Sequence, residues 1–322
     1  MLSLPRGDLG RTGVYPVSGL AEPSGVRWRT ADRRGYGLLK TVPAVADGLV
    51  VLSLGFVEHR TRGGVLALDL ASGAEVWRVE GERGSRCVLA DQSASSGGRA
   101  GRARRGIARA DEWLVTDACH AAVADQTAWL PRHREHGADR DHREDRFHGE
   151  FPWTSTEIVG HDLRTGQLRH TYVPDPGRYR IGNSPVVVAA GRVYAVLVDF
   201  GWPAWNIASR VDSPRPELHV LDAATGELVW QRELGLLPIG SLVLAGGLLY
   251  LAAADGEVHA LDADSGELRW RAHVGAELGA HVDREYDVGA DAPDPYAVVP
   301  DFLVPGDGVL YAQTRTGVLA LG

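Results

Sequence analysis

A repeated segment is the feature that most restricts the fold of this chain. Four stretches align without gaps and read apolar-x-x-x-Asp-x-x-Ser/Thr-Gly-x-x-x-Trp, with His in place of Trp in the second copy. They span residues 65–77, 158–170, 218–230 and 258–270. A fifth copy begins at Val318 and reaches Gly322, where the aspartate would stand. Repetition of this kind indicates a protein built from similar supersecondary units.

Each copy predicts two strands joined by a tight turn. Alternating residues before the aspartate are typical of a half-buried strand. The aspartate and the Ser or Thr can accept backbone N–H groups in the turn, and the glycine supplies a positive φ. The tryptophan then lies on the returning strand, where it can pack between neighbouring sheets. We therefore expect Trp77, Trp230 and Trp270 to be buried, with a thinner contact at His170.

A second pair of strands is expected before each copy, because a short turn there separates two apolar runs. These segments are residues 43–52, 107–116, 185–197, 241–252 and 302–312. Two strands plus two strands make a four-stranded antiparallel blade of about 40 residues, a period that indicates a β-propeller. The predicted fold is thus all-β, a propeller of five such blades. A degenerate sixth blade remains an alternative, and the gapless copies disfavour a β-sandwich.

The two chain ends predict how the last blade is completed. Residues 24–28, Ser-Gly-Val-Arg-Trp, resemble the missing half of the fifth copy with one residue deleted. We expect this amino-terminal strand to close the blade and remove an open sheet edge. The expected organisation is a tail at 1–25 and one propeller domain at 26–322. Long loop insertions are expected at about 79–105, 122–155, 199–216 and 275–299.

The Asp-x-x-Ser/Thr-Gly-x-x-x-Trp repeat resembles that of pyrroloquinoline quinone (PQQ) dehydrogenases and their non-enzymatic relatives, among them outer-membrane assembly lipoproteins. The resemblance implies the propeller over about residues 26–322, but the same scaffold serves enzymes and binding proteins. Such dehydrogenases carry adjacent cysteines, a calcium ion held by Glu, Asn and Asp, and a catalytic Asp. Here the two cysteines, Cys87 and Cys119, are far apart in the sequence. The sequence therefore disfavours PQQ as a cofactor and favours the non-enzymatic branch.

Composition excludes several other classes of protein. A net charge of −8 argues against a nucleic-acid-binding surface, and two cysteines provide no disulfide framework. The longest uncharged run, residues 234–254, is interrupted by Gly and Pro, so no membrane span is expected. No signal peptide is recognisable at the start. We expect a cytoplasmic monomer.

The insertions are the expected place of function. They fall between the second and third strands of a blade or between blades, whereas the other turns are short, so they should gather on one face. Aromatic residues there could anchor a ligand or partner, or pack into a small core of the loop itself. Residues at the starts of first strands could bind a polar ligand or be a solvated rim. The candidate binding residues are Trp153, Trp202, Trp205, Lys40, Asn183 and Asp301.

Metal binding and catalysis have weaker support. The histidines of the charged run 132–148 match no known ligand spacing. The acidic run 283–294 partly follows a calcium loop, but Val288 stands where that loop needs glycine. We therefore predict no metal, no cofactor and no catalytic residue. The leading hypothesis is a non-catalytic scaffold that presents a loop-rich face to a protein partner or small ligand. The alternative is an enzyme, a hydrolase, a lyase or a reduced quinoprotein, with an axial pocket on that face.

Overall fold

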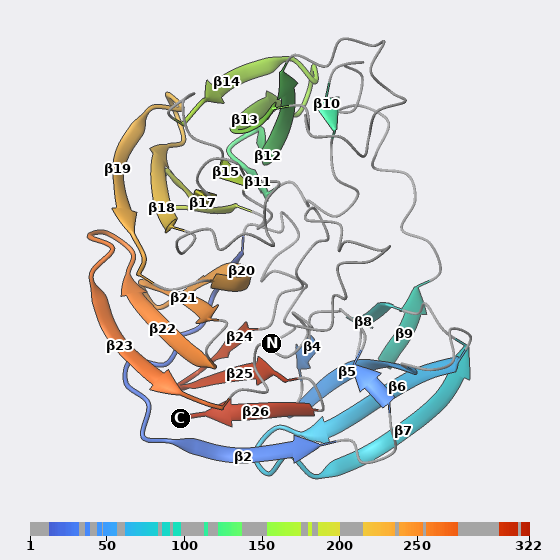
Figure 1. The fold of residues 1–322 in the computed structure, drawn as a ribbon. Helices are drawn as coiled ribbons and strands as arrows, with labels where there is room; N and C mark the ends of the chain where they lie inside the picture. Colours follow the sequence, from blue (N-terminus) through green and yellow to red (C-terminus); the bar gives the residue numbers. More distant parts are fainter. Residues whose placement is uncertain are drawn as a thin grey trace, which may run out of the picture. The chain divides into compact units, whose positions relative to one another are not determined.

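The computed structural model shows a chain made of strands (Figure 1). It describes residues 13–31, 36–38, 44–46, 48–56, 62–82, 86–90, 93–97, 113–114, 122–136, 153–174, 180–181, 186–199, 215–235, 238–253, 256–275, 303–314 and 317–322. In these residues there is no helix that is long and apolar enough to span a membrane. The chain divides into two compact units. The first is Met1–Arg102, Pro238–Arg284 and Val299–Gly322; the second is Ala103–Leu237 and Glu285–Val298.

The first unit contains three of the predicted blades. In blade one, β3 (Tyr36–Leu38) and β4 (Ala44–Ala46) form a first strand in two pieces, followed by β5 (Leu49–Phe56), β6 (Arg62–Asp69) and β7 (Glu75–Glu82). Blade four is β20 (Pro238–Ala245), β21 (Leu248–Ala253), β22 (Glu257–Asp262) and β23 (Leu268–His273). Blade five begins with β24 (Leu303–Gly306), β25 (Val309–Gln313) and β26 (Gly317–Leu321).

The second unit contains blades two and three, which have the same antiparallel order. Blade two has β10 (Trp113–Leu114) and β11 (Ala122–Ala124) in the place of the first strand, then β12 (Thr127–His136), β13 (Trp153–Asp162) and β14 (Leu168–Tyr172). Blade three has β15 (Arg180–Ile181) and β16 (Val187–Ala189), then β17 (Arg192–Asp199), β18 (Arg215–Asp222) and β19 (Leu228–Glu233). The predicted all-β class, with five four-stranded propeller blades, is confirmed.

The amino-terminal strand completes blade five, as predicted. Strand β2 (Val26–Ala31) pairs antiparallel with β26, with Trp28 opposite Ala320 and Thr30 opposite Val318. In Figure 1 the two strands lie side by side, from opposite ends of the colour bar. The third strand of blade five therefore has a partner on each side, and the edge of the sheet is formed by the start of the chain.

A β-bulge recurs in all five blades, at the residue before the tryptophan or, in blade two, before His170. In blade four, for example, Ala260 pairs with Trp270 and Leu261 with Leu268, so Arg269 has no partner in the ladder. A bulge turns its side chain away from the regular alternation. The guanidinium of Arg269 accordingly binds Asp262 Oδ2 through Nη2 at 2.7 Å. The bulged residues of the other blades are Val76, Arg169, Val229 and Arg27.

The repeated aspartate organises each turn between the third and fourth strands. Oδ1 of Asp162, Asp222 and Asp262 accepts the backbone N–H groups two and three residues later, at 2.7–3.1 Å. In blade one, Asp69 accepts the N–H of Ser72 at 2.8 Å. Hydrogen bonds to the ionised form lower the pKa of all four carboxyls. At Asp262, hydrogen bonding to Arg269 is the largest cause, and the pKa falls to about 2.

Trp28 joins blade five to blade one. The indole N–H of Trp28 donates to the carbonyl of Leu70 at 3.1 Å, and its ring lies against Gly73. Trp28 and Trp270 are each 9% exposed, and Trp77 and Trp230 are partly buried. The three predicted tryptophans are therefore mostly buried, as expected, with Trp270 the most buried of them. In the second unit His170 takes this place, and its Nδ1 lies 3.1 Å from the carbonyl oxygen of Thr225.

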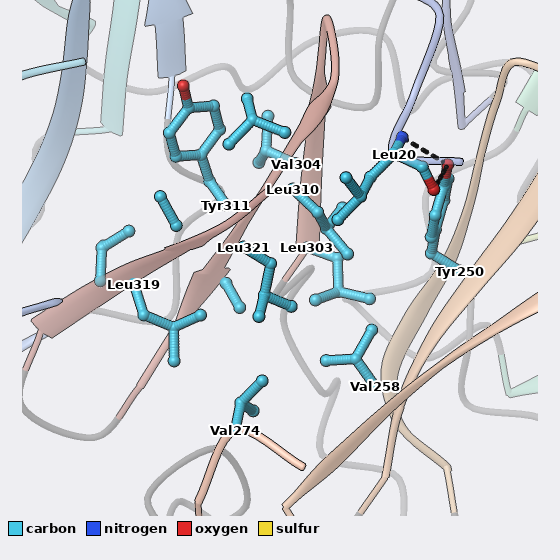
Figure 2. Close-up of a cluster of buried hydrophobic side chains, with 14 of the residues drawn as sticks. Leu20, Tyr250, Val258, Val274, Leu303, Val304, Leu310, Tyr311, Leu319 and Leu321 are labelled. Carbon is cyan, nitrogen blue, oxygen red and sulfur yellow. Dashed lines mark hydrogen bonds between the residues drawn. The ribbon is translucent and has the colours of Figure 1, made fainter. Parts of the chain in front are cut away.

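Apolar residues from several strands form a core in each unit. In the first unit the core runs from blade four into blade five, where Leu303, Leu310 and Leu319 are buried (Figure 2). In the second unit Trp129 and Ile158 of blade two pack with residues of blade three. Each core thus lies between adjacent sheets, the arrangement expected when one face of a blade buries its apolar residues against the next.

The prediction for the first half of blade two was wrong. Residues 107–116 were expected to form its first hairpin, but the hairpin is β11 and β12, closed by Asp125 and Gln126. Both turn residues have positive φ, 48° and 62°, a conformation usually taken by glycine. Strand β12 also lies within the expected insertion 122–155, so the connection to β13 is limited to residues 137–152.

The expected insertion 79–105 likewise contains the end of β7 and a hairpin of β8 (Arg86–Ala90) and β9 (Ser93–Gly97).

Replacing Gly73 with alanine should strongly destabilise the contact between blades five and one. A Cβ there would lie 2.4 Å from the ring of Trp28, and φ is +69°. We expect Gly73→Ala to lower the free energy of unfolding by roughly 2–4 kcal/mol, from left-handed strain plus overpacking. Gly48→Ala is the matched control, because φ is +77° and nothing lies within 4 Å. It should cost only about 1 kcal/mol. Equal losses in urea unfolding would contradict the role of Trp28.

The Asp262 carboxylate should make stability depend on acidic pH. Its pKa is about 2 in the folded chain against 3.8 ordinarily, so its contribution is present above about pH 4 and is lost as the pH falls toward 2. Asp262→Asn should therefore lose less stability across this window than the wild type. Arg269→Gln should likewise reduce the loss of stability between about pH 4 and pH 2, because the hydrogen bond to Arg269 is the largest cause of the lowered pKa of Asp262. Urea unfolding at several pH values measures this, and parallel curves for all three proteins would refute it.

Candidate functional site

The two ends of each blade differ in how they are closed. At one end the turn between the first and second strands is hydrogen-bonded to the turn between the third and fourth. Leu70 donates its N–H to the carbonyl of Gly48 at 2.8 Å in blade one. The same bond joins Leu163 to Gln126, Ala223 to Gly191 and Ala263 to Gly247. The connections between the second and third strands therefore leave from the opposite end of each sheet.

In blades two and three, the ends from which the connections between the second and third strands leave point in the same direction. His170 of blade two lies on Gly226, in the hydrogen-bonded turn of blade three. The two hydrogen-bonded ends are therefore adjacent within the second unit. Strands β12 and β13, and strands β17 and β18, are connected at the other end by residues 137–152 and 200–214. The end of the second unit that these two long connections share is the candidate site, and we call it the loop end.

Only one of the predicted binding residues lies in the part of the chain that the structure describes. Trp153 is the first residue of β13, at the loop end, and its backbone is paired with that of His136. The other five lie outside the described residues: Trp202, Trp205, Lys40, Asn183 and Asp301. Trp129, an aromatic residue shortly before the charged run 132–148, is a core residue. It is 1% exposed and stacks on the His170 ring, with centroids 5.2 Å apart.

A buried polar cluster, absent from the sequence prediction, links blades two and three. The hydroxyl of Tyr172, on β14, lies 2.7 Å from Nδ1 of His219 on β18. Nε2 of His219 lies 3.1 Å from Oε2 of Glu217. His219 is 1% exposed. Since an ionised carboxylate only accepts, Nε2 carries the proton and Nδ1 accepts the tyrosine O–H when the imidazole is neutral.

The cluster had a signal in the sequence. Both Glu217 and Glu257 begin the pattern Glu-x-His-x-x-Asp on the third strand of their blades. In blade four Nε2 of His259 lies 2.8 Å from Glu257. Buried polar groups are tolerated when each is hydrogen-bonded. The geometry thus supports a role in joining strands and blades; a substrate would find the imidazole of His219 already bonded through both nitrogens.

The structure provides no metal site among the residues it describes. In that part of the chain, no three or more His, Cys, Asp or Glu side chains gather in a way that could hold an ion. The charged run 132–148 is described only as far as His136, and the acidic run 283–294 lies outside the described residues.

Removing the Tyr172 hydroxyl should weaken the link between blades two and three. Tyr172→Phe leaves the buried Nδ1 of His219 without this partner. An unsatisfied buried group costs about 1–3 kcal/mol, so we expect a loss of that size in the free energy of unfolding. Thr171→Val, at the exposed neighbouring position, should change stability by less than about 0.5 kcal/mol. Equal effects of the two substitutions in urea unfolding would show that the hydroxyl is not needed.

Comparison with known proteins gives one family match for part of the chain. Residues 206–320 match the family model described as outer membrane protein assembly factor BamB. A search of curated proteins found no match.

Solved structures similar to the chain include BamB and two enzymes. BamB from Moraxella catarrhalis is 16% identical with a TM-score of 0.31, and the match covers 85% of this chain and 79% of that one. Glutaminyl cyclase of Myxococcus xanthus is 15% identical with a TM-score of 0.36, covering 94% and 100%. Quinohemoprotein alcohol dehydrogenase ADHIIG from Pseudomonas putida HK5 is 14% identical with a TM-score of 0.32, covering 91% and 61%.

These TM-scores are low, so the fold rests on the strand pairing described above. The family match covers the second half of blade three, blade four and the strands of blade five as far as Ala320, including two of the aligned repeats and the start of the fifth. The resemblance of the repeat to the PQQ-like propeller family is thus supported over residues 206–320, where the chain is similar to the BamB family model.

Proposed function

We propose that the chain is a non-catalytic binding scaffold whose loop end contacts a protein partner. The observation that carries this proposal is the difference between the two ends of each blade. One end is closed by the same hydrogen bond in four blades, whereas the other end of the second unit carries connections of 16 residues (137–152) and 15 residues (200–214). Long connections on a rigid sheet scaffold are where binding residues are usually found.

The composition of the two connections suggests how a partner would be bound. Residues 200–206 contain Phe200, Trp202 and Trp205, and aromatic side chains gain most from desolvation at an interface. Residues 137–148 are rich in charge and include Arg140. Charges at the rim of an interface act mainly on association rate and salt dependence. We therefore infer that the aromatic residues anchor the partner and that the charged residues steer it.

The family match supports a protein partner over a small ligand. The matched family is that of an outer membrane protein assembly factor, a role exercised on other proteins. The polar cluster at His219 supports a structural role for these residues, because His219 is only 1% exposed and bonds to Tyr172 and Glu217.

Two versions of the chain would identify the partner. The tagged chain and a variant in which Asn-Gly replaces residues 137–152 are used for affinity purification from the native host. A two-residue turn can close the hairpin of β12 and β13, so the paired strands of blade two are kept. A protein retained by the intact chain and lost with the replacement is then purified for direct measurement. Catalytic turnover by the purified chain, in place of binding, would contradict the proposal.

With that partner, Trp202→Ala should weaken binding at least about tenfold, because truncating an aromatic anchor costs roughly 2 kcal/mol or more. Arg140→Ala should change mainly the association rate and its dependence on salt. Surface plasmon resonance at two salt concentrations separates the two effects. Equal and negligible effects on affinity would refute the aromatic anchor.

A further inference from the structure

The residues just before β2 form a strap across blades four and five. We define the strap as residues 13–20. Its strand β1 (Val14–Tyr15) pairs parallel with β20, with Val14 opposite Leu244 and Tyr15 opposite Ala245. The N–H of Leu244 donates to the carbonyl of Gly13 at 2.8 Å. This region was expected to be a tail, yet it adds a fifth strand to the sheet of blade four, beside β20 in Figure 1.

The middle of the strap crosses the first turns of both blades. Ser18 donates its N–H to Asp307 Oδ1 at 3.0 Å, and the N–H of Gly308 donates to the carbonyl of Gly19 at 3.0 Å. On the blade-four side the approach is very close. A Cβ at Gly246 would lie 1.8 Å from the carbonyl oxygen of Ser18. The turn of blade four must therefore keep glycine at this position for the strap to lie on it.

The end of the strap is inserted between the two blades. The N–H of Leu20 donates to the hydroxyl of Tyr250 at 2.9 Å, and the indole N–H of Trp270 donates to the carbonyl of Leu20 at 3.1 Å. Burial raises the pKa of Tyr250, so its hydroxyl keeps its proton. Figure 2 shows Leu20 between Tyr250 and the blade-five residues Leu303 and Leu310.

These contacts define a groove with a recognisable sequence preference. Tyr15 and Leu20 are each 3% exposed, whereas Pro16 between them is exposed. Gly19 has φ +70°, and a Cβ there would lie 2.4 Å from the Tyr250 hydroxyl oxygen. The groove thus requires an aromatic residue, then glycine and leucine four and five positions later. Main-chain pairing supplies affinity and the side-chain pockets supply specificity, as in other strand-addition sites.

We propose that this groove is a peptide-binding site for extended segments of the pattern Tyr-x-x-x-Gly-Leu, and that residues 13–20 occupy it in cis. A partner segment of that pattern binds by displacing the strap. Displacement leaves β2 in place, because the strap ends before the bonds of Ser24 and Gly25 to Gly322 begin. The site lies in the first unit and is independent of the loop end.

The proposal is tested with the full chain and a fluorescent peptide of residues 12–21. Wild-type chain should bind the peptide weakly, because its own strap is present at high effective concentration. The Gly19→Ala chain, with a disfavoured strap, should bind it at least about tenfold more tightly by fluorescence anisotropy. A Gly19→Ala peptide should bind neither chain, and a Pro16→Ala peptide should bind like the wild type. Equal affinity of both chains for the peptide, or equal binding of the Gly19→Ala peptide, would overturn the proposal.

A second measurement keeps the test valid if Gly19→Ala does not fold. A specific protease site is inserted between the exposed Ala21 and Glu22, and the folded chain is cut there. The strap fragment should remain bound on size exclusion and should exchange with the fluorescent peptide over hours. Immediate loss of the fragment would show that the groove does not hold it. No exchange over several days would show that the strap is a permanent part of the core, and it too would overturn the proposal.

Discussion

The contact between a tryptophan of one blade and the turn glycine of the next is the interaction on which the described structure depends. The indole of Trp28 covers Gly73 and bonds to the carbonyl of Leu70, so blade five is held to blade one by packing and by a hydrogen bond together. The contact requires a turn without a Cβ. That turn is itself held by the Asp69 carboxylate, which accepts the N–H of Ser72. Within the second unit the same kind of contact joins His170 of blade two to the turn glycine Gly226 of blade three.

Variation on this contact explains the differences between blades. His170 replaces the tryptophan in blade two, stacks on Trp129 and meets Gly226 as the indole would. The smaller ring buries less area, and the cluster of Tyr172, His219 and Glu217 adds polar bonds to the same pair of blades. In blade four the indole of Trp270 bonds to Leu20, a residue of the strap. The strap thus takes the part that a turn residue plays elsewhere.

The two ends of the blades have different roles: the hydrogen-bonded turns stabilise the sheets, and the loop end is the proposed binding site. Hydrogen bonds between turns make one end uniform, and uniform turns leave little room for a specific site. At the loop end of the second unit, the ladder between β12 and β13 ends at the pair His136 and Trp153, and residues 137–152 connect the two strands. Binding at the loop end and exchange at the strap groove are separate proposals, because they lie in different units and use different residues.

The sequence by itself determined the repeat, the turns and the completion of blade five, because each depends on residues close together or on a motif copied without gaps. It did not reveal the first hairpin of blade two, since Asp125 and Gln126 adopt positive φ without the glycine that marks such turns. Only the tertiary structure decided that Trp129 is core and that Leu20 meets Tyr250, 230 residues away. A contact between residues so far apart in the sequence leaves no periodic pattern in the sequence. It is determined by how two blades pack together and not by the local residue pattern of either blade.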